Sequence, residues 1–120
     1  MTRECDRALL TLAGLCGAAG VALAAAGSHR ADQNLALAGN FLLVHAPALI
    51  GLSLVPRRLA TLAGWVLVAA LVLFCGDLSS LGLLGHALFP FAAPLGGAGL
   101  MLGWLLVVAA ALFGSGREGR

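Results

Sequence analysis

Few side chains of this sequence could do chemistry, and the most prominent is His45, at the centre of residues 35–55. This 21-residue stretch carries no formal charge and is long enough to cross a bilayer as a helix. A titratable ring in the middle of a membrane span is unfavourable, so it is expected to have a hydrogen-bond partner or a functional role. Two interpretations stay open. His45 is either a proton relay or ligand contact, or a neutral ring bonded to a carbonyl or hydroxyl of a neighbouring helix.

Asn40 is a second polar side chain in the same stretch. It precedes His45 by five residues, which is about 140° around a helix with 3.6 residues per turn. The two side chains should therefore face different neighbours. Asn40 shares its face with Ala36, Pro47 and Gly51, which predicts a close-packed seam on that side.

A second group of polar residues is expected near one membrane surface. Asp77 should end the third span, at a depth similar to that of His29 and His86. These three side chains could form a cluster, and they are of the types that metal and proton sites use. Their spacing matches no metal motif. We therefore expect capping and hydrogen bonding there, with no metal and no other cofactor.

Other reactive motifs are not visible. The sequence has no Ser-His-Asp order, no glycine-rich phosphate loop and no paired carboxylates. Cys5, Cys16 and Cys75 form no CxxC pair, which favours three unpaired structural thiols over a disulfide or a metal site. We expect no catalytic residue, so a non-enzymatic protein is favoured over an enzyme.

The composition indicates a single membrane domain over residues 1–120. Of these residues 61% are hydrophobic and 10% are charged, whereas soluble domains carry about 25% charged residues. So little charge could not cover a surface that faces water. The net charge of +2 is small and its arginines are dispersed, which argues against nucleic acid as a partner.

The spacing of the charged residues divides the chain into spans. Successive gaps without Arg, Lys, Asp or Glu are 22, 24, 18 and 39 residues long. The first three each fit one helix of about 30 Å, and the fourth holds a helix plus an apolar outer connector. The prediction is an all-α, four-helix transmembrane bundle with helices at about 8–27, 35–55, 59–78 and 94–113 and a connector at about 79–93. Trp65 and Trp104 lie well inside their spans, so we expect them to fill space or contact lipid.

The arginines predict how the bundle is oriented. Four spans place the N-terminus, the turn at 56–58 and the C-terminus on one side of the membrane. That side carries six of the seven arginines, and only Arg30 lies on the other. The six are Arg3, Arg7, Arg57, Arg58, Arg117 and Arg120. The positive-inside rule therefore predicts that both termini are cytoplasmic.

Small residues predict how the helices pack. Residues 8–27 contain eight alanines, no aromatic residue and a glycine series that includes Gly14, Gly17 and Gly20. Small residues let helix backbones approach closely in lipid, so this helix should be the central, most contacted one. Gly99 and Gly103 form a GxxxG motif that packs either within the bundle or between copies.

Four stretches resemble one known family. They are 17–29 (GAAGVALAAAGSH), 45–49 (HAPAL), 73–78 (LFCGDL) and 93–104 (APLGGAGLMLGW). Together they resemble the small four-span family of YgdD-type bacterial inner-membrane proteins and the eukaryotic transmembrane protein 256. The resemblance implies a fold, a membrane location and recurring features at His29, His45 and 94–97, but no reaction. The chain departs from the family pattern at Pro47, Cys75 and Asp77.

Three functional hypotheses follow. The first is a structural or accessory protein that lies in the lipid bilayer and packs against other membrane subunits or itself. The second is a small oligomeric transporter or permeation protein with His45 in the path. The third is an enzyme acting on a lipid or quinone through His45 or the His29, Asp77 and His86 group.

Overall fold

The computed structural model describes residues 5–113, and these residues form four helices and no strand. The helices are α1 (Arg7–Arg30), α2 (Gln33–Leu54), α3 (Arg58–Leu84) and α4 (Ala92–Phe113). Each is long and apolar enough to cross a bilayer. The predicted all-α four-helix bundle is confirmed, and the chain is a multi-pass membrane protein. Arg3, Arg117 and Arg120 lie outside the described residues.

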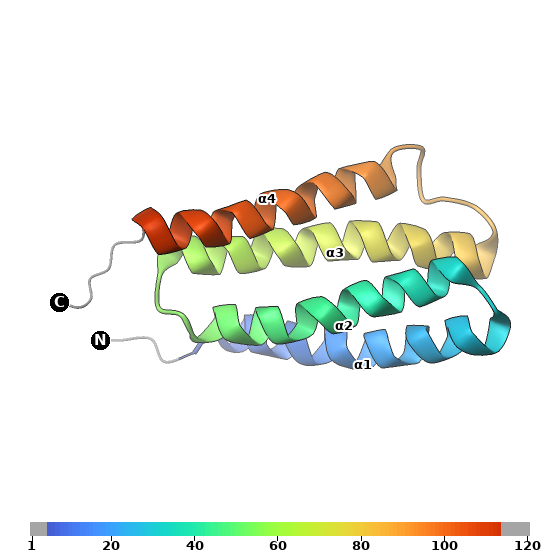
Figure 1. Ribbon diagram of the computed structural model, residues 1–120, viewed down its shortest axis with the longest axis horizontal. Coiled ribbons are helices and arrows are strands. Elements are labelled where there is room, and N and C mark those ends of the chain that lie inside the picture. The colour runs from blue at the N-terminus through green and yellow to red at the C-terminus, as the bar shows by residue number, and fades with distance from the viewer. Residues whose placement is uncertain (1–4, 114–120) are drawn as a thin grey trace.

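The helices are arranged as two hairpins that lie side by side (Figure 1). α1 packs mainly on α2, α2 packs on α3, and α3 packs on α4. The backbones of α1 and α4 therefore lie at opposite edges of the bundle. The start of α1, the α2–α3 turn and the end of α4 lie at the same end (Figure 1). A hydrogen bond from the Asp6 backbone N–H to the Ser53 carbonyl, at 2.8 Å, joins the first two of these.

The prediction that the first helix is the central one is wrong. α1 has four buried residues, whereas α3 has ten. The small residues of α1 allow a very close approach to one neighbour, α2, but they do not surround α1 with helices. A Cβ added at Gly39 of α2 would overlap the backbone of Ala24, and one added at Gly27 would meet the Ala36 backbone nitrogen at 2.5 Å.

The second close seam joins α3 and α4. A Cβ at Gly96 would lie 2.7 Å from the Phe74 backbone nitrogen, and one at Gly103 would lie 2.5 Å from a Leu67 methyl carbon. Gly99 faces Ala70 in the same seam. The GxxxG motif of α4 thus packs within the bundle, on α3.

The remaining glycines named from the sequence are distributed differently. Gly20 is in the α1–α2 seam, where an added Cβ would lie 2.9 Å from Leu43. A Cβ added at Gly17 would make only an ordinary contact with Ala46. One added at Gly14 would have nothing within 4 Å. The α1–α2 seam therefore uses the second half of α1.

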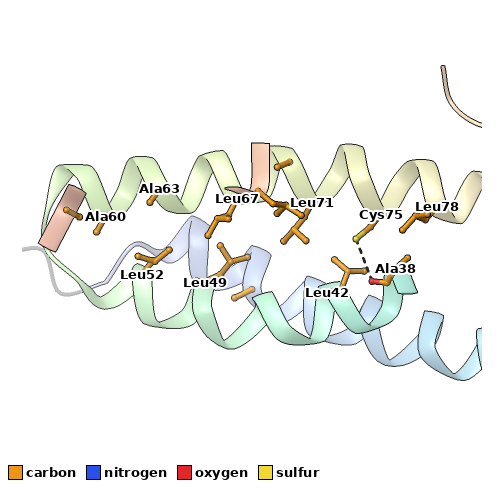
Figure 2. Packing of buried hydrophobic residues seen from close by; sticks show 14 residues of the cluster. Ala38, Leu42, Leu49, Leu52, Ala60, Ala63, Leu67, Leu71, Cys75 and Leu78 are labelled. Carbon is orange, nitrogen blue, oxygen red and sulfur yellow. Dashed lines mark hydrogen bonds between the residues drawn. The ribbon is translucent and has the colours of Figure 1, made fainter. Parts of the chain in front are cut away.

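Between the two hairpins, α2 and α3 bury the apolar core (Figure 2). Leucines at 42, 49 and 52 of α2 face leucines at 67 and 71 of α3, with alanines filling the narrower places. The Cys75 thiol donates to the Ala38 carbonyl across this interface, at 3.6 Å. This burial holds the hairpins together and fixes the depth of the polar residues on each helix.

The first turn is two residues long. The N–H of Asp32 bonds to the Gly27 carbonyl at 2.9 Å, which closes α1 with Ala31 in the left-handed region at φ 52°. Asp32 then caps α2, because its Oδ1 accepts from the backbone N–H groups of Asn34 and Leu35.

The predicted end of the third helix is wrong. α3 continues past residue 78 to Leu84 and ends at Gly85, which has φ 83°. The connector is therefore 85–91 and not 79–93. The charge of Asp77 suggests a span boundary, yet this residue is 3% exposed inside the helix. Its carboxylate can be buried because the connector folds back and supplies a backbone donor.

Candidate functional site

The candidate site is centred on His45, which α2 and α4 enclose at the middle of the bundle. His45 is 5% exposed. Its Nδ1 lies 2.7 Å from the Phe41 carbonyl oxygen, one turn earlier on α2. Its Nε2 lies 3.1 Å from the indole Nε1 of Trp104 on α4. Both ring nitrogens therefore have protein partners.

These two bonds define one protonation state of the ring. A carbonyl oxygen only accepts, so Nδ1 carries the hydrogen and donates to Phe41. An indole N–H only donates, so Nε2 is unprotonated and accepts from Trp104. The arrangement is that of a neutral imidazole in its Nδ1–H tautomer. A proton placed on Nε2 would break the bond to Trp104.

An aromatic cluster surrounds the imidazole and joins three helices. The ring of Phe41 stacks on that of His45 with centroids 6.0 Å apart. Phe41 also contacts Phe74 of α3 at 4.7 Å, and His45 contacts the Trp104 ring at 5.7 Å. These contacts exclude water from the ring and fix its orientation. The geometry suits a structural histidine that fastens α4 to α2.

Asn40 is placed differently from the prediction. Its side chain is exposed on the outside of α2, and Pro47 on the same face is also exposed. A Cβ added at Gly51 would have nothing within 4 Å. The expected close-packed seam is therefore wrong at Asn40, Pro47 and Gly51, whereas Ala36 does pack closely, on Gly27 of α1. The close seam runs through the adjacent Gly39, which faces α1.

A small hollow lies beside Asn40. It has a volume of about 170 Å³ and is lined by Asn40, Phe41, Val44 and His45. We call it the His45 hollow. Its lining surface is apolar, so it suits an apolar occupant.

The polar residues near the α3–α4 connector serve local structure. The Asp77 Oδ1 accepts from the Leu88 backbone N–H at 2.8 Å, and the Ser80 hydroxyl donates to the His86 carbonyl at 2.6 Å. The side chains of His29 and His86 are exposed. Within residues 5–113, no three His, Cys, Asp or Glu side chains are close enough to hold a metal ion. His29, Asp77 and His86 therefore do not converge on one site.

A second concavity lies between the other ends of α2 and α4. It has a volume of about 340 Å³ and is lined by Leu52, Val55, Arg57, Val107, Ala110 and Ala111. We call it the Arg57 groove. Arg57 precedes α3, and its Nη1 donates to the Ala110 carbonyl at 2.9 Å. This bond satisfies one of the last four carbonyls of α4.

Sequence reasoning missed Trp104 as the partner of His45. The available signal was depth, because His45 and Trp104 are each the thirteenth residue of a 22-residue helix. The second and fourth spans of the predicted four-helix bundle run parallel, so residues at the same position along each helix lie at similar depth. An indole N–H well inside a span also requires an acceptor.

Comparison with known proteins supplies a family. A family model described as a protein of unknown function (DUF423) matches residues 16–97, which is more than half of the chain. The matched segment contains all of α2 and α3, and with them His45. No curated protein and no solved structure matches the chain.

Proposed function

Because this chain belongs to the DUF423 family, whose function is unknown, we propose that it is a structural or accessory membrane protein. It packs against a larger membrane complex or against a second copy of itself. The observation that carries this proposal is the exposed amide of Asn40.

Asn40 is seven residues into α2, which is about 10 Å along the helix axis. At that depth lipid offers the amide no hydrogen-bond partner. Polar side chains such as Asn bond across helix interfaces in membranes, with energies of about 1 kcal/mol. A helix from another subunit that packs over this face of α2 would give the exposed Asn40 amide a partner and cover Val44, which is 64% exposed.

The outer face of α1 also supports association. Gly14, Ala18 and Ala22 are exposed there at intervals of four residues. Small residues at this spacing permit close helix approach in a membrane. α1 packs mainly on α2, so this face is open to a second contact.

The same proposal includes a location and an orientation. Arg7, Arg57 and Arg58 lie at one end of the bundle, opposite Arg30 (Figure 1). The positive-inside rule then favours a cytoplasmic position for both termini. The sequence resemblance favours the inner membrane of a bacterium as the location.

The transporter hypothesis has weaker support. A proton relay requires a ring nitrogen that can exchange a proton along the path, whereas both nitrogens of His45 are bonded inside the bundle. The lipid or quinone enzyme hypothesis is weakened by the same bonds and by the separation of His29, Asp77 and His86.

Substitution of Asn40 tests the proposal. The tagged protein is isolated in mild detergent at its natural expression level, and the co-purifying membrane proteins or second copies are quantified. Asn40→Leu should reduce the recovered partner several-fold. Gln33→Leu removes an exposed amide at the start of the same helix and should leave recovery unchanged. Equal recovery from both variants would refute the role of Asn40.

A further inference from the structure

We propose that the Arg57 groove binds an anionic phospholipid, with its phosphate at Arg57 and one acyl chain between α2 and α4. This inference concerns a different part of the molecule from the partner surface at Asn40. It does not depend on the identity of the partner.

The lining of the groove matches an amphiphile. Five of its six lining residues are apolar, and the sixth is a half-buried arginine. Arg57 uses one N–H to cap Ala110, and a guanidinium carries five donors. The remaining donors can bind phosphate oxygens in the paired geometry that arginine favours.

The position of the groove along the helices also fits a lipid. Arg57 lies in the turn between α2 and α3, where the spans end. Its charge therefore lies at the level of the lipid headgroups, and the apolar walls extend from it into the hydrocarbon region. An amphiphile with its head at Arg57 would have the same orientation as the surrounding lipids.

The helix faces that line the groove continue towards the middle of the bundle. Trp104, Val107 and Ala111 are three and seven residues apart, so they share one face of α4. On α2, His45 and Leu52 are seven residues apart and also share a face. From His45 to the end of α2 at Leu54 is nine residues, or about 14 Å of helix, which is close to half of a bilayer core of about 30 Å. The lining of the groove itself reaches Leu52 and Val107. The His45–Trp104 bond lies deeper along the same helix faces, where the end of an acyl chain would reach it.

Fluorescence quenching of Trp104 can detect the chain. Trp65→Phe leaves Trp104 as the one indole of the chain. This variant is placed in phosphatidylcholine vesicles that contain, at equal mole fraction, either phosphatidylglycerol or phosphatidylcholine with brominated acyl chains. Bulk lipid around Trp104 quenches equally in the two cases. A chain held in the groove should give an apparent affinity about fivefold higher for the anionic lipid, as expected for one arginine near the surface.

Two substitutions locate the headgroup site. Arg57→Gln should abolish the preference for the anionic lipid, and Arg57→Lys should retain part of it. Arg58→Gln is the matched control, because Arg58 is the adjacent exposed arginine and does not line the groove. It should retain most of the preference. Equal losses in Arg57→Gln and Arg58→Gln would mean general surface attraction and would overturn the proposal.

A third substitution tests the acyl chain with Arg57 intact. Ala111→Phe fills the groove and should remove the excess quenching, whereas Leu112→Phe on the lipid side should not. Inorganic phosphate should not compete with the bound lipid. Relief of the excess quenching by phosphate would indicate a simple anion site. Equal quenching by the two brominated lipids, as a protein helix seated in the groove would produce, would also overturn the assignment.

Discussion

The indole N–H of Trp104 on α4 donates to Nε2 of His45 on α2, across 3.1 Å. The two residues are 59 positions apart, and the backbones of α2 and α4 do not pack directly on each other. Their side chains bridge the gap between α2 and α4, and the Arg57 groove lies between the same two helices nearer their ends. The bond therefore holds α4 over α3 at a fixed distance from α2.

Removing the donor should weaken this attachment. Trp104→Phe keeps an aromatic ring but leaves Nε2 of His45 without its partner. Membrane hydrogen bonds contribute about 0.6 kcal/mol on average, and an orphaned buried acceptor costs more, so we expect a loss of about 1 kcal/mol. Unfolding in mixed micelles measures the change in free energy. Trp65→Phe, at a similarly exposed indole on α3, is the control. An equal loss in the control would show that the bond has no specific effect.

Two glycine-to-alanine substitutions on α2 should change the free energy of unfolding in opposite directions. Gly39→Ala places a methyl group against the Ala24 backbone, and overpacking of this kind costs about 1–3 kcal/mol. Gly51→Ala meets open space and should stabilise the helix slightly, by up to about 1 kcal/mol. The same unfolding measurement compares them. Equal effects would contradict the α1–α2 seam.

The α1–α2 turn allows a stabilising change. Ala31 has φ 52°, a conformation that is unfavourable by about 1–2 kcal/mol for an L-residue and free of strain for glycine. Ala31→Gly should therefore raise the stability by about 1 kcal/mol. Ala18→Gly, on an exposed part of α1, should lower it by about the same amount. A loss of stability in Ala31→Gly would argue against the observed turn.

Cysteine labelling tests the proposed orientation. Ser28 and Arg58 are exposed near opposite ends of the bundle. In a variant with Cys5 replaced by serine, a membrane-impermeant maleimide should label Ser28→Cys in intact cells. It should label Arg58→Cys only after the membrane is opened. The reverse pattern would place the termini outside the cytoplasm.

Much of the fold could be predicted because charge and proline mark span ends directly. The gaps between charged residues gave four helices, and Pro56 lies in the α2–α3 turn. The use of charged residues as markers of span ends failed at Asp77, because a carboxylate that accepts from a backbone N–H can lie within a helix. The small residues of α1 also led to a wrong prediction of its place in the bundle. They indicate close contact with a neighbouring helix but not the number of neighbours.

The contacts of the candidate site were harder to predict. His45 was singled out because a ring at mid-span requires partners. The identity of those partners depends on how α4 returns along α3, and hence on where α3 ends. The predicted spans at 35–55 and 94–113 already place His45 and Trp104 at similar depth, but depth alone does not show which face α4 presents to α2. Arg57 likewise contributed to the orientation, but its bond to Ala110 depends on tertiary packing.

Native mass spectrometry tests the central claim most directly, because that claim is association with another membrane subunit or with a second copy. The protein is extracted gently at its natural expression level and transferred intact. We predict that the wild-type protein is detected in a complex with other membrane proteins or as a defined oligomer. The Asn40→Leu variant should be detected with fewer associated subunits. A monomer that carries only lipid, identical in wild type and variant, would contradict the proposed accessory role.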